Sequence, residues 1–135
     1  MSEKGMRAQV VRALRPLHAV AVENRVGPGT PDVNHSLGWM ELKWRKTWPK
    51  IKPHEPVLFE HFTPQQRIWL RSRAERGGMV HLMAKIGQDW IVLDGAWAAE
   101  HFGRVGSEVL LQLNSAWRCH GKLDGKGLVS WLRAS

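Results

Sequence analysis

The sequence predicts an α/β domain in which helices flank a mixed central sheet, in the order helix, three strands, helix, strand. Two segments with capping residues and regularly spaced apolar residues are typical of helices, and several short runs rich in Val, Ile, Leu, Met and Trp lie between Gly- and Pro-containing turns, as strands do. A chain of 135 residues with 43% hydrophobic residues can bury one core. We therefore expect one domain over residues 1–135, with a core at about 3–94 and a C-terminal extension at about 95–135.

The first helix is predicted to begin after Ser2, which can cap it, and to run to about Leu14, since Pro16 follows. A strand is predicted from His18 to Arg25 because Val20 and Val22 would lie on one face and Ala19, Ala21 and Glu23 on the other. Residues 27–31 contain two glycines and two prolines, which make a short and stiff connection. That connection fixes where the next residue, an aspartate, enters the sheet.

Residues 33–44 are predicted to form two strands joined by a turn at residues 36–38. Side chains alternate between the faces of a strand, so Glu41 and Lys43 lie on the same face. Pairing of the two strands can bring Asp32 beside them. Two carboxylates and an ammonium group would then meet at one patch of the sheet.

Such a patch has a specific chemical use. Two carboxylates can hold a hard divalent cation such as Mg²⁺, which polarises a phosphoryl oxygen and lowers the pKa of a bound water. A lysine beside the cation can orient or deprotonate the attacking water, or stabilise charge on the phosphate. The patch is therefore suited to phosphodiester hydrolysis. Two structural alternatives remain open: Pro-Asp is common in turns, and Glu41 and Lys43 can form a charge pair on a solvated face.

The segment Pro31-Asp32 followed by Glu41-x-Lys43 resembles the signature of the PD-(D/E)XK nuclease superfamily. Three further landmarks fit its phage and archaeal Holliday-junction resolvase-like branch or its VRR-type branch: Glu3 at the start of a helix, the turn Gly29-Thr30-Pro31-Asp32, and the helix start Thr63-Pro64-Gln65-Gln66-x-x-Trp69-Leu70. The resemblance spans residues 3–86. It implies a restriction-endonuclease-like core and a metal-dependent DNA endonuclease, selective for branched DNA or nicking, in phage-type replication, recombination or repair.

The resemblance also implies a set of metal ligands. Asp32 and Glu41 would ligate one or two Mg²⁺ or Mn²⁺ ions, with the Leu42 carbonyl as a further ligand. Glu3 would help as a third carboxylate. Glu23 is a second candidate for that role, and each of these two acids has a structural alternative, as a solvated acid at a helix start or as a charge pair at a strand end.

The same resemblance assigns roles in the chemical step. Lys43 would position the attacking water and stabilise the transition state, and Gln66 would orient Lys43 or that water. Gln65 is the alternative glutamine, and an amide on a solvated helix face is the plain structural explanation for either residue. The helix that carries them is predicted from Thr63 as its cap, Pro64 at its first position and the glycines at residues 77–78.

Composition indicates a polyanionic partner. Lys and Arg number 20 against 12 Asp and Glu, which gives a net charge of +8, and such a surplus is expected of a protein with a polyanionic partner, without specifying which polyanion. We expect the DNA backbone to be held by the basic loop after the third strand and by the second helix, through Arg45, Lys46, Lys50, Lys52, Arg67 and Arg71. Trp44 and Trp48 interleave with the loop cations, either to stack on bases or to pack beneath a solvated charge run.

The rest of the chain is predicted to support this core. Strands at residues 79–86 and 89–93 should complete the sheet, followed by a helix at 96–102, a strand at 105–113 and a short helix at 128–133. One cysteine, Cys119, excludes an internal disulfide, and no apolar run approaches the roughly 18 residues of a membrane span. We therefore expect a cytoplasmic protein of a bacterial or phage-infected cell, without a membrane partner and able to form a homodimer.

Other function classes receive less support. The chain has no CxxC or HExxH zinc motif, no nucleophile elbow and no phosphate-cradling GxxxxGK loop. Two alternatives to the nuclease remain open: a non-catalytic nucleic-acid-binding module that retains the nuclease fold, and a basic protein that binds other proteins. The first would bind DNA with a steep salt dependence and no cleavage, whereas the second would have no affinity for DNA at low salt.

Overall fold

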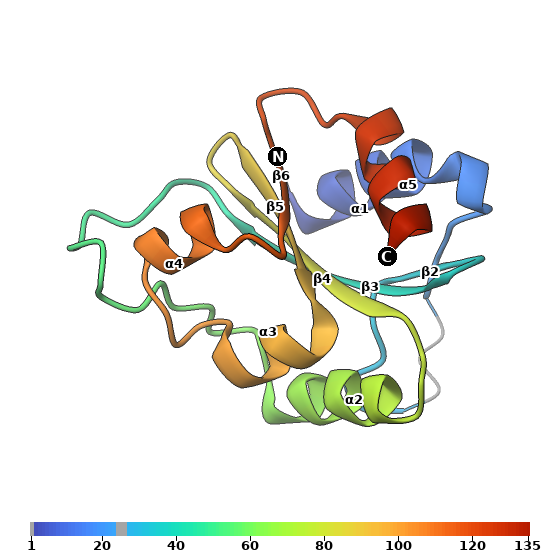
Figure 1. Cartoon of the computed structure of the whole chain (residues 1–135), viewed down its shortest axis with the longest axis horizontal. Coiled ribbons are helices and arrows are strands. Elements are labelled where there is room, and N and C mark those ends of the chain that lie inside the picture. The colour runs from blue at the N-terminus through green and yellow to red at the C-terminus, as the bar shows by residue number, and fades with distance from the viewer. Residues whose placement is uncertain (1, 24–26) are drawn as a thin grey trace.

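The computed structural model describes residues 2–23 and 27–135 and has an α/β fold, with helices on both faces of a six-stranded mixed sheet (Figure 1). The strands lie in sequence order: β1 (Val20–Ala21), β2 (Val33–His35), β3 (Gly38–Arg45), β4 (Val80–Ile86), β5 (Asp89–Asp94) and β6 (Trp117–His120). All neighbouring strands are antiparallel except β3 and β4, which run parallel because a helix connects them. Apart from a short 3-10 helix after the first helix, the chain up to β4 follows the predicted order of helix, three strands, helix and strand.

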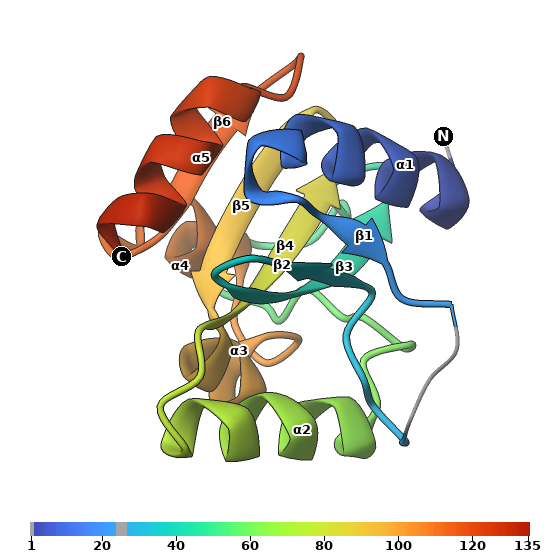
Figure 2. The ribbon, with the colours of Figure 1, turned by 90° about the vertical axis from the view of Figure 1, so that its right-hand side faces the viewer.

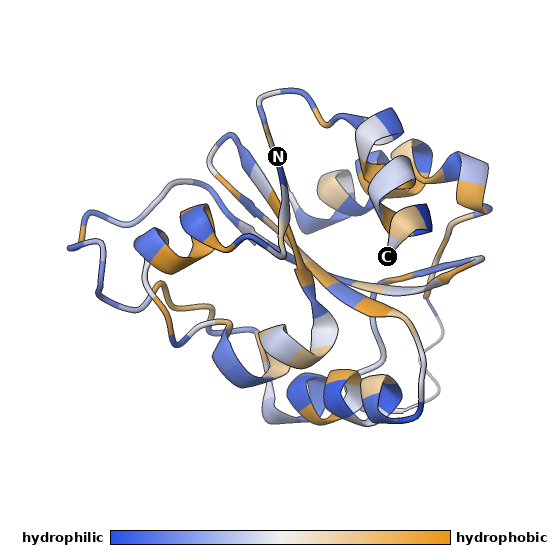
Figure 3. Ribbon diagram, viewed as in Figure 1, coloured by the Kyte–Doolittle hydropathy of each residue, from blue (hydrophilic) through white to orange (hydrophobic). Residues whose placement is uncertain are grey.

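Helices α1 (Glu3–Ala13) and α5 (Gly125–Ala134) cover one face of the sheet, and α2 (Pro64–Glu75) and α3 (Gly95–His101) cover the other (Figure 2). A short 3-10 helix (Arg15–Leu17) follows α1, and α4 (Ser107–Gln112) precedes β6. Hydrophobic residues concentrate in the central strands, whereas hydrophilic residues alternate with them along α2 (Figure 3). The segment after residue 94 thus supplies β6 to the sheet and α5 to the core that contains α1.

Several predicted elements are confirmed almost to the residue. Ser2 caps α1, since its side chain accepts a hydrogen bond of 3.1 Å from the Gly5 amide. The hairpin at residues 33–45, the helix beginning at Pro64, the strand pair β4–β5 and helix α3 lie within about two residues of their predicted positions. The predicted C-terminal helix is present and longer, because α5 begins at Gly125.

Three expectations are wrong. In the described part of the predicted strand His18–Arg25, only Val20 and Ala21 are in a strand, since His18 takes a left-handed conformation with φ of 53°; Arg25 lies outside the described residues. The segment 105–113 contains the helix α4 and no strand; the buried Leu110 lies four residues after the buried cap residue Gly106, which is a helical spacing. The strand β5 does not complete the sheet, because β6 pairs with its outer edge.

The crossover from β3 through α2 to β4 decides where a site can form. The end of β3 and the starts of α1 and α2 lie on the same side of the molecule (Figure 2). Three chain segments that are far apart in the sequence therefore end or begin in the same region. No helix in residues 2–23 or 27–135 has the length and apolar character that a membrane crossing requires.

Candidate active site

Asp32 is fixed to strand β3 by a hydrogen bond to the main chain. The register of β2 and β3 pairs Val33 with Met40, and one more step sets Asp32 opposite Glu41. The Asp32 Oδ2 atom accepts a hydrogen bond of 2.9 Å from the Leu42 amide. The Asp32 side chain thus accepts the hydrogen bond that a main-chain carbonyl would accept from the Leu42 amide if β2 were longer. Asp32 and Glu41 consequently lie on the same face of the sheet.

Lys43 completes this group from the same strand. Glu41 and Lys43 point to the same face, and the Lys43 Nζ lies 3.9 Å from the Glu41 Oε2. Their side chains are only 7% and 1% exposed, respectively. Lys43 also donates a hydrogen bond of 3.1 Å to the His61 carbonyl and lies 5.6 Å from the centre of the Phe62 ring. The ammonium group is therefore oriented by the loop that precedes α2.

A cavity of about 720 Å³ opens beside these residues. Its walls come from the start of α1, from β3 and its flanking loops, and from the start of α2: Glu3, Lys4, Met6, Arg7, Asp32, Leu42, Lys43, Trp44, His61 and Gln66. The structure thus brings five of the six predicted catalytic and metal-binding residues to one cavity. The sixth, Glu41, is fully buried and does not line the cavity.

The oxygen atoms around Asp32 are of the kind that a hard divalent cation accepts. The N–H and C=O groups of one strand residue point to the same edge, so the Leu42 carbonyl faces the side on which Asp32 binds the Leu42 amide. Two carboxylates and a carbonyl are the oxygen donors that Mg²⁺ accepts, with waters in its other positions. Within the part of the chain that the structure describes, no three His, Cys, Asp or Glu side chains form a metal-binding group. Glu3 therefore shares the cavity without completing a set of three acids.

Gln66 has a structural role as well as a place in the cavity. Its Oε1 accepts a hydrogen bond of 3.0 Å from the Thr63 amide, and its own amide donates to the Thr63 hydroxyl at 3.2 Å, which is a capping box. An influence of Gln66 on Lys43 stays a prediction. The alternative glutamine, Gln65, lines a different groove, and Glu23 is exposed and does not line the cavity.

The basic loop after β3 is anchored to the fold. Arg45 donates a hydrogen bond of 2.8 Å to the Leu58 carbonyl, and the Trp48 indole donates one of 2.7 Å to Asp89 on β5. This bond holds Trp48 against the domain, which favours the packing explanation for that indole over base stacking. The three predicted lysine contacts of the loop are exposed: Lys46, Lys50 and Lys52.

The two predicted DNA contacts on α2 have protein partners. Arg67 donates a hydrogen bond of 3.1 Å to the Ala99 carbonyl, and Arg71 lies 3.2 Å from the Glu100 carboxylate. Burial, and then the nearby charges of Arg104 and Arg71, lower the pKa of the Arg67 guanidinium. Both arginines thus join α2 to α3, and their contact with DNA stays a prediction.

Two cations of the cavity were missed in the sequence. Lys4 and Arg7 line it from the first turns of α1, and among the described residues neither has a carboxylate within ion-pair distance. The spacing could have indicated Arg7, because it follows Glu3 by four residues and therefore lies on the same side of the helix. Lys4 directly follows Glu3.

No protein-family model matches this chain, and no curated protein has a significantly similar sequence.

Proposed function

We propose that this protein is a metal-dependent DNA endonuclease with a restriction-endonuclease-like core, which hydrolyses phosphodiester bonds at the cavity beside β3. One observation carries the proposal: the Leu42 amide holds Asp32 opposite Glu41, and Lys43 lies 3.9 Å from Glu41 and lines the same cavity as Asp32. The order of α1, three antiparallel strands, α2 and a parallel β4 supports the proposed core.

Asp32 and Glu41 would hold one or two Mg²⁺ or Mn²⁺ ions together with the Leu42 carbonyl, and Glu3 would contribute from the start of α1. When bound, such an ion supplies a polarised phosphoryl oxygen and a water of lowered pKa. The chain itself contributes the position of both carboxylates. Asp32 is held by a main-chain bond, so its carboxylate needs no reorganisation when substrate arrives, whereas the buried Glu41 would have to turn toward the cavity to reach the ion.

Lys43 positions the attacking water and stabilises negative charge on the phosphate. Its contacts with the His61 carbonyl and Glu41 orient the ammonium group before the reaction, which is the condition under which such a group lowers a barrier most. Because the Gln66 oxygen accepts the Thr63 amide, the Gln66 amide nitrogen is the group that would donate to the water. Lys4 and Arg7 would bind the phosphates that flank the cleaved bond.

The net charge of +8 and the exposed Lys46, Lys50 and Lys52 support DNA as the partner. Selectivity for branched or nicked DNA, action as a homodimer, a place in recombination or repair, and a bacterial or phage-infected cytoplasm are parts of the proposal that rest on the resemblance.

The test is incubation of the protein with linear, nicked, single-stranded and four-way-junction DNA, each with Mg²⁺, with Mn²⁺ and with a chelator. We expect cleavage only where a divalent ion is present, and faster cleavage of branched or nicked DNA than of linear duplex. Intact DNA in every lane with both ions would contradict the proposal.

A second candidate is a nucleic-acid-binding module without catalysis. Two observations favour it: Glu41 is fully buried, and the described residues contain no group of three metal-binding side chains. Such a module would bind DNA with a steep salt dependence and would never cleave it.

A further inference from the structure

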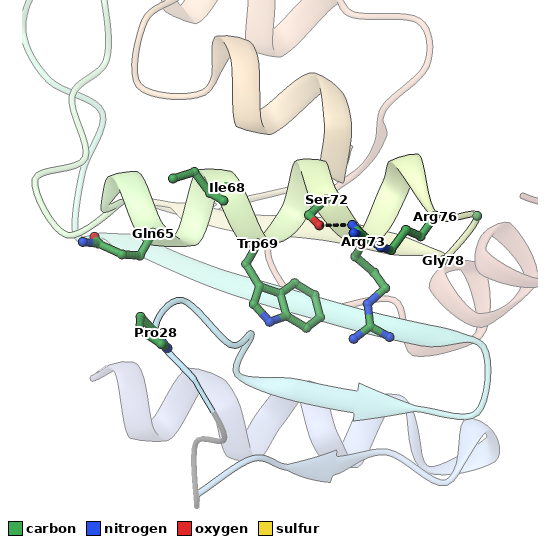
Figure 4. A pocket seen from close by; sticks show the side chains of 9 residues that line it. Pro28, Gln65, Ile68, Trp69, Ser72, Arg73, Arg76 and Gly78 are labelled. Atoms are coloured by element: carbon green, nitrogen blue, oxygen red, sulfur yellow. Dashed lines mark hydrogen bonds between the residues drawn. The ribbon is translucent and has the colours of Figure 1, made fainter.

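A second groove, of about 700 Å³ and separate from the cavity beside β3, lies along α2 (Figure 4). The residues of α2 that line it recur at spacings of three and four, so they form one continuous stripe along the helix. The lining residues that matter here are Pro28, Gln65, Ile68, Trp69, Arg73 and Arg76. Neither the proposed mechanism nor the predicted DNA contacts use this groove.

The groove offers flat and apolar surfaces. Trp69 and Arg73 project side by side from α2 toward β3, with Pro28 near one end of the groove and Gly78 at the other (Figure 4). The Trp69 ring lies edge-on to Trp39, with ring centres 5.2 Å apart, and the Arg73 guanidinium lies 4.7 Å from the Trp69 ring. Ile68 also lines the groove and is 63% exposed, an unusual fraction for a large apolar side chain.

The charge of the groove is positive. Arg73 and Arg76 line it, and no carboxylate does. Within the described residues, neither arginine forms an ion pair, and the Arg76 guanidinium donates only to the Ser72 hydroxyl. An arginine stacked on an indole keeps the N–H groups at its edge available for an anion. A complementary ligand therefore has flat apolar faces together with negative charge, as an unpaired nucleotide strand has.

The groove is close to the proposed active site. Gln65 lines the groove and the next residue, Gln66, lines the catalytic cavity. Trp39, which contacts Trp69, lies on the same face of β3 as Lys43. The two residues are four positions apart, which at about 3.3 Å for each residue of a strand is a distance of about 13 Å. That length corresponds to a few nucleotides at about 3.4 Å each along a stacked strand.

We infer that this groove binds a single-stranded DNA segment, so that the substrate is a duplex that carries a single-stranded arm. The bases of the arm lie against Trp69 and Ile68, and its phosphates contact Arg73 and Arg76. The inference rests on the proposed nuclease function for the class of substrate, but the binding itself needs no cleavage. An acidic peptide with apolar side chains would meet the same charges, and the test below distinguishes it.

The experiment measures binding in the presence of EDTA, so that its result does not depend on whether the protein is a nuclease. Fluorescence anisotropy titrations compare a blunt 20-base-pair duplex, the same duplex with a ten-nucleotide thymidine arm at its 5′ or its 3′ end, and an acidic peptide of alternating Asp and Leu. We expect one of the arms to increase affinity about tenfold over the blunt duplex, the scale of stacking one or two bases.

The variants separate the groove from general electrostatics. The matched control is Arg133→Glu, a charge reversal at an exposed position of α5 on the other face of the sheet (Figure 2). Arg73→Glu should remove the gain in affinity from the arm. It should weaken binding to the blunt duplex only as much as Arg133→Glu does. Trp69→Leu should remove most of the gain, and the melting midpoint of each variant reports whether it folds. Ile68→Ser, at an exposed position, repeats the test if Trp69→Leu fails to fold.

The inference is overturned if neither arm increases affinity, or if Arg73→Glu and Arg133→Glu weaken the armed duplex equally. It is also overturned if the acidic peptide binds in an Arg73-dependent way and the arm does not. A protein that cleaves blunt DNA but shows no arm effect would sustain the nuclease proposal and refute the groove. The reverse outcome, an arm effect without cleavage under any ion, would sustain the groove and refute the nuclease.

Discussion

The Asp32 carboxylate and the Leu42 amide form a hydrogen bond of 2.9 Å that joins the residue before β2 to the middle of β3. The bond continues the pairing of the two strands beyond their last main-chain contact, and it also fixes a carboxylate opposite Glu41. One interaction thus contributes both to the fold and to the site, and substitutions at Asp32 can separate the two contributions.

Asp32→Asn keeps an oxygen that can accept the Leu42 amide but removes the charge. We expect the melting midpoint and the DNA affinity to stay at their wild-type values, because binding depends on phosphate contacts. Cleavage should fall by more than about a hundredfold, since even the partners of metal ligands contribute about 10- to 100-fold. Initial rates on nicked and junction DNA measure the effect, with Glu108→Gln, an exposed acid on α4, as the control.

Glu41 and Lys43 should be energetically coupled, because they lie 3.9 Å apart in an almost fully buried environment. Lys43→Met alone is expected to lower the free energy of unfolding by about 3 kcal/mol, since it removes a positive charge from beside a buried carboxylate. The double variant with Glu41→Gln should recover at least about 1 kcal/mol of that loss but no cleavage. Urea denaturation of the four proteins gives the coupling, and strictly additive effects would contradict it.

The capping box at the start of α2 predicts a different pattern for Thr63 and Gln66. Thr63→Ala removes the hydroxyl that accepts the Gln66 amide and should destabilise the protein by about 1 kcal/mol with little effect on cleavage. Gln66→Glu preserves an oxygen for the Thr63 amide but replaces the amide nitrogen, so it should fold normally and cleave more slowly. Equal cleavage rates for Gln66→Glu and wild type would exclude a role for that nitrogen.

His81 predicts that stability falls in mild acid. The residue is 5% exposed, its buried Nδ1 has no hydrogen-bond partner among the described residues, and its ring packs against Trp131 of α5. Burial lowers the pKa of His81 from 6.5 to about 4; the nearby Asp94 opposes this shift and His35 adds to it. Between these values the unfolded chain binds more protons than the folded one, so the free energy of unfolding decreases as pH falls.

The expected loss between pH 6.5 and 4 is about 3 kcal/mol from this histidine, at 1.36 kcal/mol for each pKa unit. His35 should add to it, because burial also lowers its pKa. Chemical denaturation at several pH values measures the slope. His81→Phe should flatten it, whereas His54→Gln at an exposed position should not. An unchanged slope in His81→Phe would show that His81 has the same pKa in the folded and unfolded states.

The elements that the sequence predicted well are those with local signals. The α2 helix carries its own cap in Thr63 and Pro64, and the hairpin of β2 and β3 carries its own turn. The alternation of side chains along β3 was enough to predict that Glu41 and Lys43 share a face. The pairing of β2 with β3 was enough to predict that Asp32 lies beside them.

The elements that were missed depend on contacts distant in the sequence. Strand β6 exists because it pairs with β5, and the segment has only four residues of mixed character. Helix α4 begins after its cap residue Gly106, whose backbone packs closely against the Pro53 carbonyl, a contact that no pattern within 105–113 encodes. The cations Lys4 and Arg7 join the cavity only because α1 packs across the sheet beside β3.

The most direct test of the central claim compares wild type with Glu41→Gln in Mn²⁺-dependent cleavage of supercoiled plasmid and of junction DNA. The variant keeps the size of the buried side chain and removes its charge, and circular dichroism and EDTA-phase DNA binding establish that it folds and binds. The account predicts ion-dependent cleavage by the wild type and none by Glu41→Gln. Equal cleavage by the two proteins, or cleavage that persists in chelator, would contradict it.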